Sequence, residues 1–455
     1  MKKPRLGVLI KPASSDCNMA CDYCYYRKVG DLYAGNPAHR MSLRVFDELC
    51  RQYRALEPAE LKFGWQGGEP TLMGLEFFQQ VINIERKHSR PAERWGNSIQ
   101  TNGVVLDDGW CDFFKRQGFL VGLSLDGPAG LNQMRKFPNG RQTHDMAMRA
   151  VNLLQKHGCD FNILAVISTA NVDQPEAVFR LLVENELHFS QFIPCTEPAP
   201  GGAGLSEHSI TGEQYAEFMT RLFNAWVDND DPGYYVRHID NWLHLFLGLE
   251  PECCEYRRDC SDLITVEWNG DVYPCDFFVE DRCRLGNVLE QTLSQALSSS
   301  VWKDFVRRAE QYPALCHGCE WLRACHGGCY RHRERLGIGP DEKPYLCDAN
   351  KKIFSHVFET FEDLRSSPIR PRLHKFLNEL TGRVQAAGLH GAEVVRPART
   401  EQQGIRSSNG GRNAACPCGS GEKWKYCCMK RSEAGHASST ASLTKAVAQE
   451  AKRAE

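Results

Sequence analysis

Short apolar segments alternate with longer amphipathic segments through the first half of the 455-residue chain. The short segments predict β-strands over residues 6–11, 61–66, 97–101, 120–125, 161–167 and 188–194. In most of the intervening segments, apolar residues recur every three or four positions, which predicts helices over residues 42–56, 75–88, 107–117, 144–157 and 175–186. Regular alternation of strands and helices is typical of a parallel sheet with crossover helices.

The number of strand–helix units indicates how this sheet closes. Six units are fewer than the eight that form a full barrel, so we predict an α/β fold that begins with a partial (β/α)6 TIM-like barrel over residues 1–235. Active sites of such barrels lie at the carboxyl ends of the strands. Residues of chemical interest follow the predicted strands at that end: Cys17, Gly67, Gly68, Glu69, Asn102, Ser124, Asp126 and Pro194.

The pattern changes after the barrel segment. Cysteines become dense between Cys253 and Cys347, which predicts a second, metal-organised domain over residues 236–370. Residues 371–412 are expected to contain a helix and then an Arg-, Gly- and Ser-rich linker. A compact cysteine cluster follows in residues 413–430, and we expect residues 431–455 to form a flexible tail.

The amino-acid composition indicates which partners and which cellular compartment to expect for this protein. Lys and Arg total 55 against 57 Asp and Glu, so no excess charge favours nucleic acid or an anionic membrane as the main partner. No run of about 18 apolar residues is present, and residues 6–10 are too short for a signal-peptide core. We therefore expect a cytoplasmic protein. That compartment disfavours disulfides, so many of the 21 cysteines are better explained as metal ligands or redox groups.

Three cysteines lie close together directly after the first predicted strand: Cys17, Cys21 and Cys24. A 4Fe-4S cluster has four irons to bind, so three thiolates leave one iron free to chelate the amino and carboxylate groups of S-adenosylmethionine (SAM). An electron from the cluster can then break a sulfur–carbon bond of SAM and form a carbon radical. The alternatives are a zinc site, which needs a fourth ligand, and a redox dithiol, which needs only two cysteines.

This three-cysteine spacing resembles the signature of the radical SAM superfamily. Gly67 and Gly68, followed by Glu69, resemble its glycine-rich motif, whose backbone contacts the methionine amino group of SAM. The resemblance implies that Ser124 and Arg135 hold the ribose and carboxylate of SAM and that Tyr23 reaches the adenine. The alternatives are a simple tight turn for the glycines and a solvated charge for the arginine.

Eight further cysteines recur with regular spacing in the second domain: Cys254, Cys260, Cys275, Cys316, Cys319, Cys325, Cys329 and Cys347. Eight thiols make two sets of four, and two structural zincs would use the same number. Spacing alone does not assign the cysteines to sets. The array resembles the SPASM domain, which binds two 4Fe-4S clusters, and the resemblance implies one set of Cys254, Cys260, Cys275 and Cys329 and another of Cys316, Cys319, Cys325 and Cys347.

Longer runs narrow the resemblance to the anaerobic sulfatase-maturating enzymes. They lie within residues 6–360: Lys11-Pro-Ala-Ser-Ser, Trp65-Gln-Gly-Gly-Glu-Pro-Thr-Leu-Met-Gly, Gln100-Thr-Asn-Gly, Gly122-Leu-Ser-Leu-Asp-Gly-Pro, Gln191-Phe-Ile-Pro, Asn269-Gly-Asp-Val-Tyr-Pro-Cys-Asp and Ala324-Cys-His-Gly-Gly-Cys. That family oxidises a cysteine or serine of a sulfatase, within a Cys/Ser-x-Pro-x-Arg segment, to Cα-formylglycine (3-oxoalanine). The resemblance implies a sulfatase substrate, three 4Fe-4S clusters, SAM and a reduced ferredoxin or flavodoxin-type electron donor.

The same resemblance makes Asp276 the catalytic base. The oxidation needs a group that takes the thiol or hydroxyl proton, and Asp276 directly follows Cys275. The alternative is an ordinary surface aspartate after a strand. Two other functions stay open: a SPASM peptide maturase that forms thioether or carbon–carbon crosslinks, and an electron carrier or scaffold without radical chemistry.

A last cysteine group lies near the end of the sequence: Cys416, Cys418, Cys427 and Cys428. It resembles the SEC-C zinc motif, and so small a segment needs a metal to fold. Lys423, Trp424 and Lys425 give it a cationic and aromatic face, which suggests docking to another protein. The remaining cysteines are expected to be buried thiols or bystanders: Cys50, Cys111, Cys159, Cys195, Cys253 and Cys283.

Overall fold

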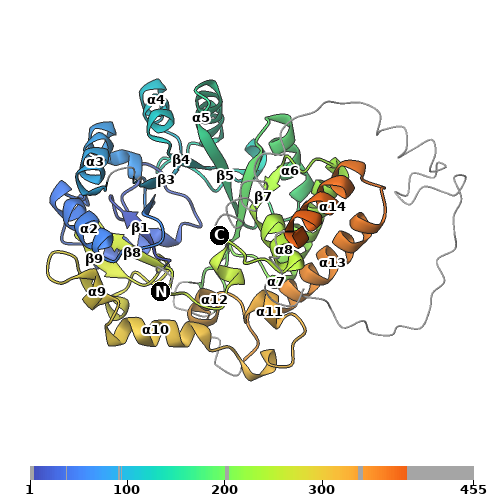
Figure 1. The fold of residues 1–455 in the computed structure, drawn as a ribbon. Coiled ribbons are helices and arrows are strands. Elements are labelled where there is room, and N and C mark those ends of the chain that lie inside the picture. Colours follow the sequence, from blue (N-terminus) through green and yellow to red (C-terminus); the bar gives the residue numbers. More distant parts are fainter. Residues whose placement is uncertain are drawn as a thin grey trace, which may run out of the picture. The chain divides into compact units, whose positions relative to one another are not determined.

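A single ten-stranded sheet organises the protein, with the order β10-β9-β8-β1-β2-β3-β4-β5-β6-β7 (Figure 1). The computed structural model describes residues 5–36, 38–90, 93, 95–199, 204–336 and 342–386. All of them belong to one compact unit, residues 1–395. The six predicted strands are all present: β1 (Gly7–Lys11), β2 (Lys62–Trp65), β3 (Gly96–Thr101), β4 (Leu120–Ser124), β5 (Asp160–Ile167) and β6 (Phe189–Pro194).

These six strands are parallel to their neighbours, and helices connect them as predicted. The helices are α2 (Leu43–Ala55), α3 (Leu75–His88), α4 (Asp108–Gln117), α5 (His144–Lys156) and α6 (Pro175–Glu184). Side-chain caps mark several starts: Ser42 accepts a hydrogen bond from the Val45 amide, and Asp107 accepts one from the Trp110 amide. The prediction of a partial α/β barrel is confirmed.

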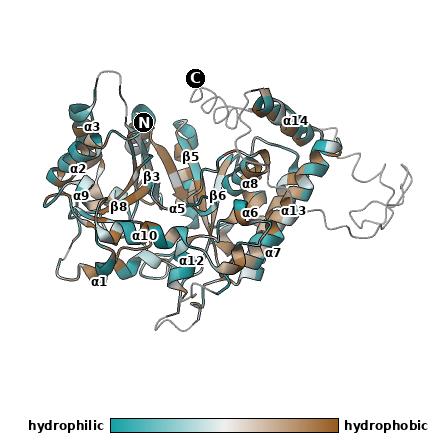
Figure 2. Cartoon of the chain, turned by 60° about the horizontal axis from the view of Figure 1, so that its bottom comes forward, coloured by the Kyte–Doolittle hydropathy of each residue, from teal (hydrophilic) through white to brown (hydrophobic). Residues whose placement is uncertain are grey.

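The core lies between the strands and these helices. In β5, alternate residues are buried toward the helices, as the two-residue period of a strand requires. In β5 they are Ile163, Ala165 and Ile167, and Figure 2 shows β5 largely apolar beside helices whose colours alternate. The residues between them in β5, such as Asn162 and Leu164, are only half-buried. The residues on the inner face of β5 are therefore more accessible than those that pack on the helices.

The cysteine-dense segment extends the same sheet rather than forming a separate one. It contributes β8 (Leu263–Glu267), β9 (Asp271–Tyr273) and β10 (Gly286–Asn287), while β7 (Tyr235–Val236) lies at the opposite edge. Strand β8 is parallel to β1 and brings Glu267 opposite Lys11. Sequence patterns did not predict this pairing, because it joins strands that are more than 250 residues apart in the chain. The predicted boundary near residue 235 stays a prediction.

The remaining helices cover the sheet beyond β6 or surround the cysteine-dense segment (Figure 1). They are α1 (Val29–Leu32), α7 (Gly212–Asn229), α8 (Arg237–Leu247), α9 (Leu293–Ala296), α10 (Ser300–Glu310), α11 (Leu322–Cys325), α12 (Tyr330–Arg335), α13 (Cys347–Ser366) and α14 (Pro371–Ala386). Helix α13 packs against α7, α8 and α14. Within the described part of the chain, no helix has both the length and the apolar composition that a membrane crossing needs.

Candidate active site and metal centres

The cysteine loop, residues 12–24, follows β1 at the carboxyl end of the barrel strands. It carries three half-buried thiols: Cys17, Cys21 and Cys24. Backbone hydrogen bonds tie the loop to the segment after β4, because the Ala20 amide donates to the Lys136 carbonyl at 2.7 Å and the Asp22 amide donates to the Met134 carbonyl at 3.1 Å. The three thiols are thus held on one anchored loop, as the spacing predicted.

The glycines after β2 pack directly on this loop. The Gly68 amide donates to the Ser14 carbonyl at 2.6 Å, and the Glu69 amide donates to the Asp16 carbonyl at 2.8 Å. A Cβ atom on Gly68 would lie 2.0 Å from the Asp16 carbonyl oxygen. Gly67 has a φ of 136°, which side chains other than hydrogen rarely allow. Close packing against the cysteine loop therefore requires glycine at both positions. The sequence resemblance implied only contact with SAM as the reason for these glycines.

Glu69 joins three segments at this end of the barrel. Its side chain is almost fully buried and accepts hydrogen bonds from the Thr71 amide and hydroxyl, the Thr101 hydroxyl and the Asn102 amide. Burial raises its pKa in spite of these hydrogen bonds. The Asn102 side chain in turn donates to the Asn18 side chain at 2.7 Å. Glu69 thus fixes the segment after β3 against the cysteine loop.

Tyr23 and Arg135 come together around a carboxylate that sequence reasoning noted but did not assign. The Tyr23 hydroxyl donates to Asp126 Oδ2 at 2.5 Å, and Arg135 Nε lies 2.9 Å from Asp126 Oδ1. The Arg135 guanidinium also lies 5.5 Å from the centre of the Tyr23 ring. Ser124 lies at the end of β4 and accepts a hydrogen bond from Gln100 at 2.9 Å. The alternative of a solvated Arg135 is wrong, because this side chain is buried.

The surroundings of Cys17 and Cys21 favour the neutral thiol at both positions. Burial raises the pKa of Cys17 to about 12, with a further contribution from Glu69, and it raises the pKa of Cys21 to about 11. The three thiolates would also repel one another. Iron cations would remove both penalties, because thiolate is the form that binds metal. The loop therefore fits an iron–sulfur cluster chemically.

The fold groups the eight cysteines of the second region into two sets. The first set is Cys254, Cys260, Cys275 and Cys329. Burial raises the pKa of the half-buried Cys260 to about 12. Mutual repulsion adds to this effect, because Cys329 interacts electrostatically with Cys254 and Cys260, and Cys275 interacts with Cys329 and Cys254. These contacts lie within one of the two sets that the resemblance implied, and the assignment of each cysteine to a cluster stays a prediction.

The second set lines one cavity of about 350 Å³. Its members are Cys316, Cys319, Cys325 and Cys347. Among the described residues, no three His, Cys, Asp or Glu side chains converge as the ligands of one metal ion do. Zinc holds four sulfurs at about 2.3 Å from a single point. Four thiols that line one cavity supply the number of ligands that a 4Fe-4S cluster takes, so the set fits such a cluster chemically.

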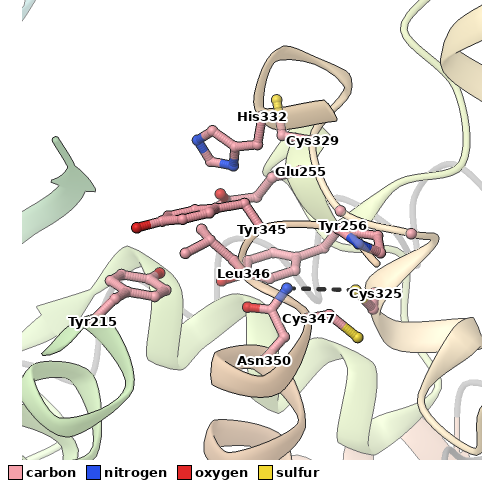
Figure 3. Close-up of a pocket in the computed structure, with 13 residues that line it drawn as sticks. Tyr215, Glu255, Tyr256, Cys325, Cys329, His332, Tyr345, Leu346, Cys347 and Asn350 are labelled. Carbon is pink, nitrogen blue, oxygen red and sulfur yellow. Dashed lines mark hydrogen bonds between the residues drawn. The ribbon is translucent and has the colours of Figure 1, made fainter. Parts of the chain in front are cut away.

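A pocket open to solvent is lined by members of both sets (Figure 3). Figure 3 shows Cys329 of the first set above it and Cys325 and Cys347 of the second set below it. Asn350 donates a hydrogen bond to the Cys325 sulfur at 3.4 Å. Burial lowers the pKa of His332 to about 3, so its ring stays neutral. Sequence reasoning missed both side chains, although Asn350 lies one helical turn after Cys347 on α13.

Asp276 is buried in a polar cluster and is not the surface residue that the alternative reading allowed. The Tyr25 hydroxyl donates to Asp276 Oδ2 at 2.7 Å, and Lys11 Nζ lies 3.5 Å from the same oxygen. The other oxygen, Oδ1, lies 3.5 Å from the Cys275 sulfur. Tyr25 directly follows Cys24, so the residue next to the cysteine loop contacts Asp276. Sequence reasoning did not single out Lys11 or Tyr25 as site residues.

Aromatic packing fixes the segment around Asp276. The Tyr25 and Phe277 rings lie 4.6 Å apart, and the Arg331 guanidinium lies 3.7 Å from the centre of the Phe277 ring. Arg331 also forms an ion pair with Glu197, which follows β6. The helix after Cys329 is thereby connected to the carboxyl end of the barrel. These contacts hold the Asp276 carboxylate between the barrel and the first cysteine set.

The cysteines outside the three groups are buried, as predicted: Cys50, Cys111, Cys159, Cys195, Cys253 and Cys283. Cys253 donates its amide to Asn241 at 2.8 Å, and burial raises the pKa of its thiol to about 12. The predicted zinc ligands Cys416, Cys418, Cys427 and Cys428 lie outside the described residues.

Family models match three segments of the chain. The radical SAM superfamily model matches residues 12–182. A model described as an iron-sulfur cluster-binding domain, SPASM, matches residues 254–320. A SEC-C motif model matches residues 412–430.

Similar proteins agree with these matches. The chain is 33% identical over 370 residues to a serine-type anaerobic sulfatase-maturating enzyme of Bacteroides thetaiotaomicron, covering 77% of this chain and 89% of the relative. It is 34% identical over 358 residues to a cysteine-type enzyme of Clostridium perfringens, covering 78% and 97%.

Solved structures separate the family from a wider fold group. A structure described as native anSMEcpe with bound AdoMet and Cp18Cys peptide matches with a TM-score of 0.73 and 32% identity, covering 83% of this chain and 100% of the other. Streptococcus suis SuiB bound to its precursor peptide SuiA matches with a TM-score of 0.54 and 14% identity, covering 76% of each chain, which shows a common fold only. The buried cysteine loop, the two cysteine sets and these relatives together show that the chain belongs to the anaerobic sulfatase-maturating enzymes, which are radical SAM oxidoreductases with a SPASM domain.

Proposed function

We propose that this protein oxidises one cysteine or serine of a sulfatase to Cα-formylglycine, within a Cys/Ser-x-Pro-x-Arg segment. The observation that carries the proposal is the buried Asp276 carboxylate, which contacts Tyr25 of the cysteine-loop segment and the sulfur of Cys275. This carboxylate lies between the segment that follows the cysteine loop and the sulfur of Cys275, which supports Asp276 as the proposed proton acceptor. We expect the reaction to take place in the cytoplasm, where the sulfatase segment is still unfolded.

The proposed cofactors are SAM and three 4Fe-4S clusters, one for each group of thiols. When bound, SAM and the cluster on Cys17, Cys21 and Cys24 supply a carbon radical that takes one hydrogen atom from the substrate β-carbon. We propose that the Gly67–Gly68–Glu69 backbone, Ser124, Arg135 and Tyr23 bind SAM. Arg135 and Tyr23 are already fixed by Asp126, so little side-chain freedom remains to be lost on binding.

Asp276 is proposed to accept the substrate thiol or hydroxyl proton. Its hydrogen bond from Tyr25 orients one oxygen, and its burial excludes bulk water as a competing acceptor. Loss of this proton makes the substrate radical strongly reducing, so the second electron can leave toward the first cysteine set. The oxidation then balances as one hydrogen atom, one proton and one electron removed from the substrate.

Three parts of the proposal rest on sequence alone. A reduced ferredoxin or flavodoxin-type protein is the proposed electron donor. The SEC-C segment is proposed to bind one zinc through Cys416, Cys418, Cys427 and Cys428. We further propose that its Lys423–Trp424–Lys425 face docks to another protein.

The test is anaerobic incubation of reduced enzyme with SAM and peptides that contain the motif with either cysteine or serine. Formylglycine formation should remove about 2 mass units from serine or about 18 from cysteine. A peptide in which alanine replaces the target residue is the matched control and should not change. Formation of 5′-deoxyadenosine with a crosslinked peptide and no aldehyde would favour a peptide maturase instead. No 5′-deoxyadenosine at all would rule out radical SAM chemistry.

A further inference from the structure

Lys11 is a fully buried lysine at the end of β1, on the inner face of the barrel. Its ammonium group lies 3.5 Å from Asp276 Oδ2 and 4.3 Å from the centre of the Tyr26 ring. Among the described residues, no atom forms a hydrogen bond of good geometry with this ammonium. Strand pairing also places Lys11 opposite Glu267, another fully buried residue.

A buried ammonium is expensive for a fold, because the interior solvates it poorly. Burial lowers the pKa of Lys11, and the carboxylates of Asp276 and Glu267 oppose that shift and favour the charged form. An apolar side chain of similar length would fill the same space without this cost. The position of the charge therefore calls for an explanation beyond packing.

The geometry of Asp276 supplies one. One carboxylate oxygen contacts the Lys11 ammonium, and the other lies 3.5 Å from the Cys275 sulfur. As a metal ligand, Cys275 is a thiolate and has no proton to share with that oxygen. Two negative groups then face each other inside the protein, and Lys11 is the cation placed to compensate them. Electrostatic interactions are strong at such buried sites because little water screens them.

We propose that Lys11 is a positioning residue that holds the Asp276 carboxylate beside Cys275 and raises the reduction potential of the cluster on the first cysteine set. The inference deepens the proposed function and rests on it. One electron added to that cluster increases the negative charge next to a fixed cation, which favours reduction. Lys11 thus makes the first set a better acceptor for the electron that leaves the substrate.

The test compares full-chain holoenzymes in which Lys11 is replaced by Met, Gln or Arg. Midpoint potentials come from anaerobic redox titrations followed by electron paramagnetic resonance. Lys11→Met and Lys11→Gln should lower one cluster midpoint by at least about 59 mV, a tenfold change in a one-electron equilibrium. The other midpoints serve as internal controls and should not move. Lys11→Arg keeps the charge and should stay close to wild type.

Asp276→Asn provides a comparison of opposite sign. Removal of the anion beside Cys275 should raise the same midpoint, and the double variant with Lys11→Met should return toward wild type. A packing defect would not produce opposite shifts that cancel. In turnover, Lys11→Met should increase the ratio of 5′-deoxyadenosine to aldehyde, because radicals still form but fewer complete the oxidation.

Two results would overturn the proposal. One is unchanged midpoints in uncharged Lys11 variants that keep their full iron content. The other is loss of iron from all three Lys11 variants, Arg included, which would make Lys11 a packing residue. The potentials need no sulfatase peptide, so they test Lys11 even if wild-type enzyme fails to form aldehyde and the proposed function is wrong.

Discussion

The cysteine loop and the first cysteine set reach similar chemistry by opposite routes. The loop contains three thiols within eight consecutive residues, and Gly67 and Gly68 pack closely against its backbone. The first set consists of Cys254 in a short 3-10 helix and of Cys260, Cys275 and Cys329 in loops before β8, after β9 and before α12. The whole fold must therefore form before these thiols meet. A site whose ligands are close in the sequence can thus be recognised from their spacing. A site whose ligands come from distant segments depends on how the strands and helices are arranged.

Their charges differ as well. Beside the loop lies the buried Arg135–Asp126 ion pair, and both of its residues belong to the segment that follows β4. The first set has the Lys11–Asp276 pair, which joins β1 to the segment after β9. A change in the loop should therefore abolish the first chemical step, whereas a change near Asp276 should affect a later one.

The largest expected effect comes from removing the loop thiols. Replacement of Cys17, Cys21 and Cys24 by Ala should abolish 5′-deoxyadenosine formation, because no radical-forming cluster remains. Iron should fall from about twelve to about eight per chain. Iron analysis and chromatography of the nucleoside measure both. Loss of all iron would contradict the independence of the loop from the two cysteine sets.

Asp276→Asn should affect the second step selectively. The change keeps the size of the side chain but removes its ability to accept a proton, so aldehyde formation should fall by about 100-fold or more. SAM cleavage and iron content should remain. The loss should be greater for a serine peptide, because a thiol with a pKa of about 8.5 can lose its proton to buffer more readily than an alcohol.

Quantitative mass spectrometry of both peptides gives the measurement. Equal yields from wild type and Asp276→Asn on both peptides would show that another group takes the proton. Asp276 would then be only a structural neighbour of Cys275.

Gly68→Ala tests the packing that shapes the loop. The new Cβ would lie 2.0 Å from the Asp16 carbonyl oxygen, so the loop backbone must move. We expect SAM cleavage to fall by about tenfold, with a stability loss of about 1–3 kcal/mol. Gly130→Ala is the matched control, because a Cβ there meets no atom within 4 Å. Equal SAM cleavage by the two variants would show that the close contact with Asp16 does not require glycine at position 68.

The smallest effect on SAM cleavage is expected at Glu85, which belongs to neither region and should affect only the stability of the fold. Burial raises its pKa to about 7, although Asn97 donates hydrogen bonds to both carboxylate oxygens. A raised carboxyl pKa stabilises the fold below the unfolded pKa of about 4.5, and that stability is lost as pH rises through about 7. The difference amounts to about 3 kcal/mol.

Melting temperatures at about pH 5 and about pH 8 provide the measurement for Glu85. The decrease between them should be smaller for Glu85→Gln than for wild type, with SAM cleavage unchanged in both. If the melting temperatures of both proteins depended equally on pH, ionisation of Glu85 would not lower the free energy of unfolding.

Local patterns accounted for most of the barrel. The predicted strands and helices match β1 to β6 and α2 to α6 within a few residues, because amphipathic periodicity and caps such as Ser42 act over single turns. The pairing of β8 with β1 was not predictable in this way. Its register depends on which distant segment packs beside β1, and no short-range pattern records that choice.

The sequence by itself determined the three-thiol loop, the glycines beside it, the presence of eight further cysteines and the family resemblance. These features depend on residues that are neighbours in the chain. Only the tertiary structure brought Lys11 and Tyr25 to Asp276 and placed four distant cysteines, Cys316, Cys319, Cys325 and Cys347, around one cavity. Such contacts join segments about 250 residues apart, and only the packing of β8 on β1 and of α12 and α13 around them makes the segments neighbours.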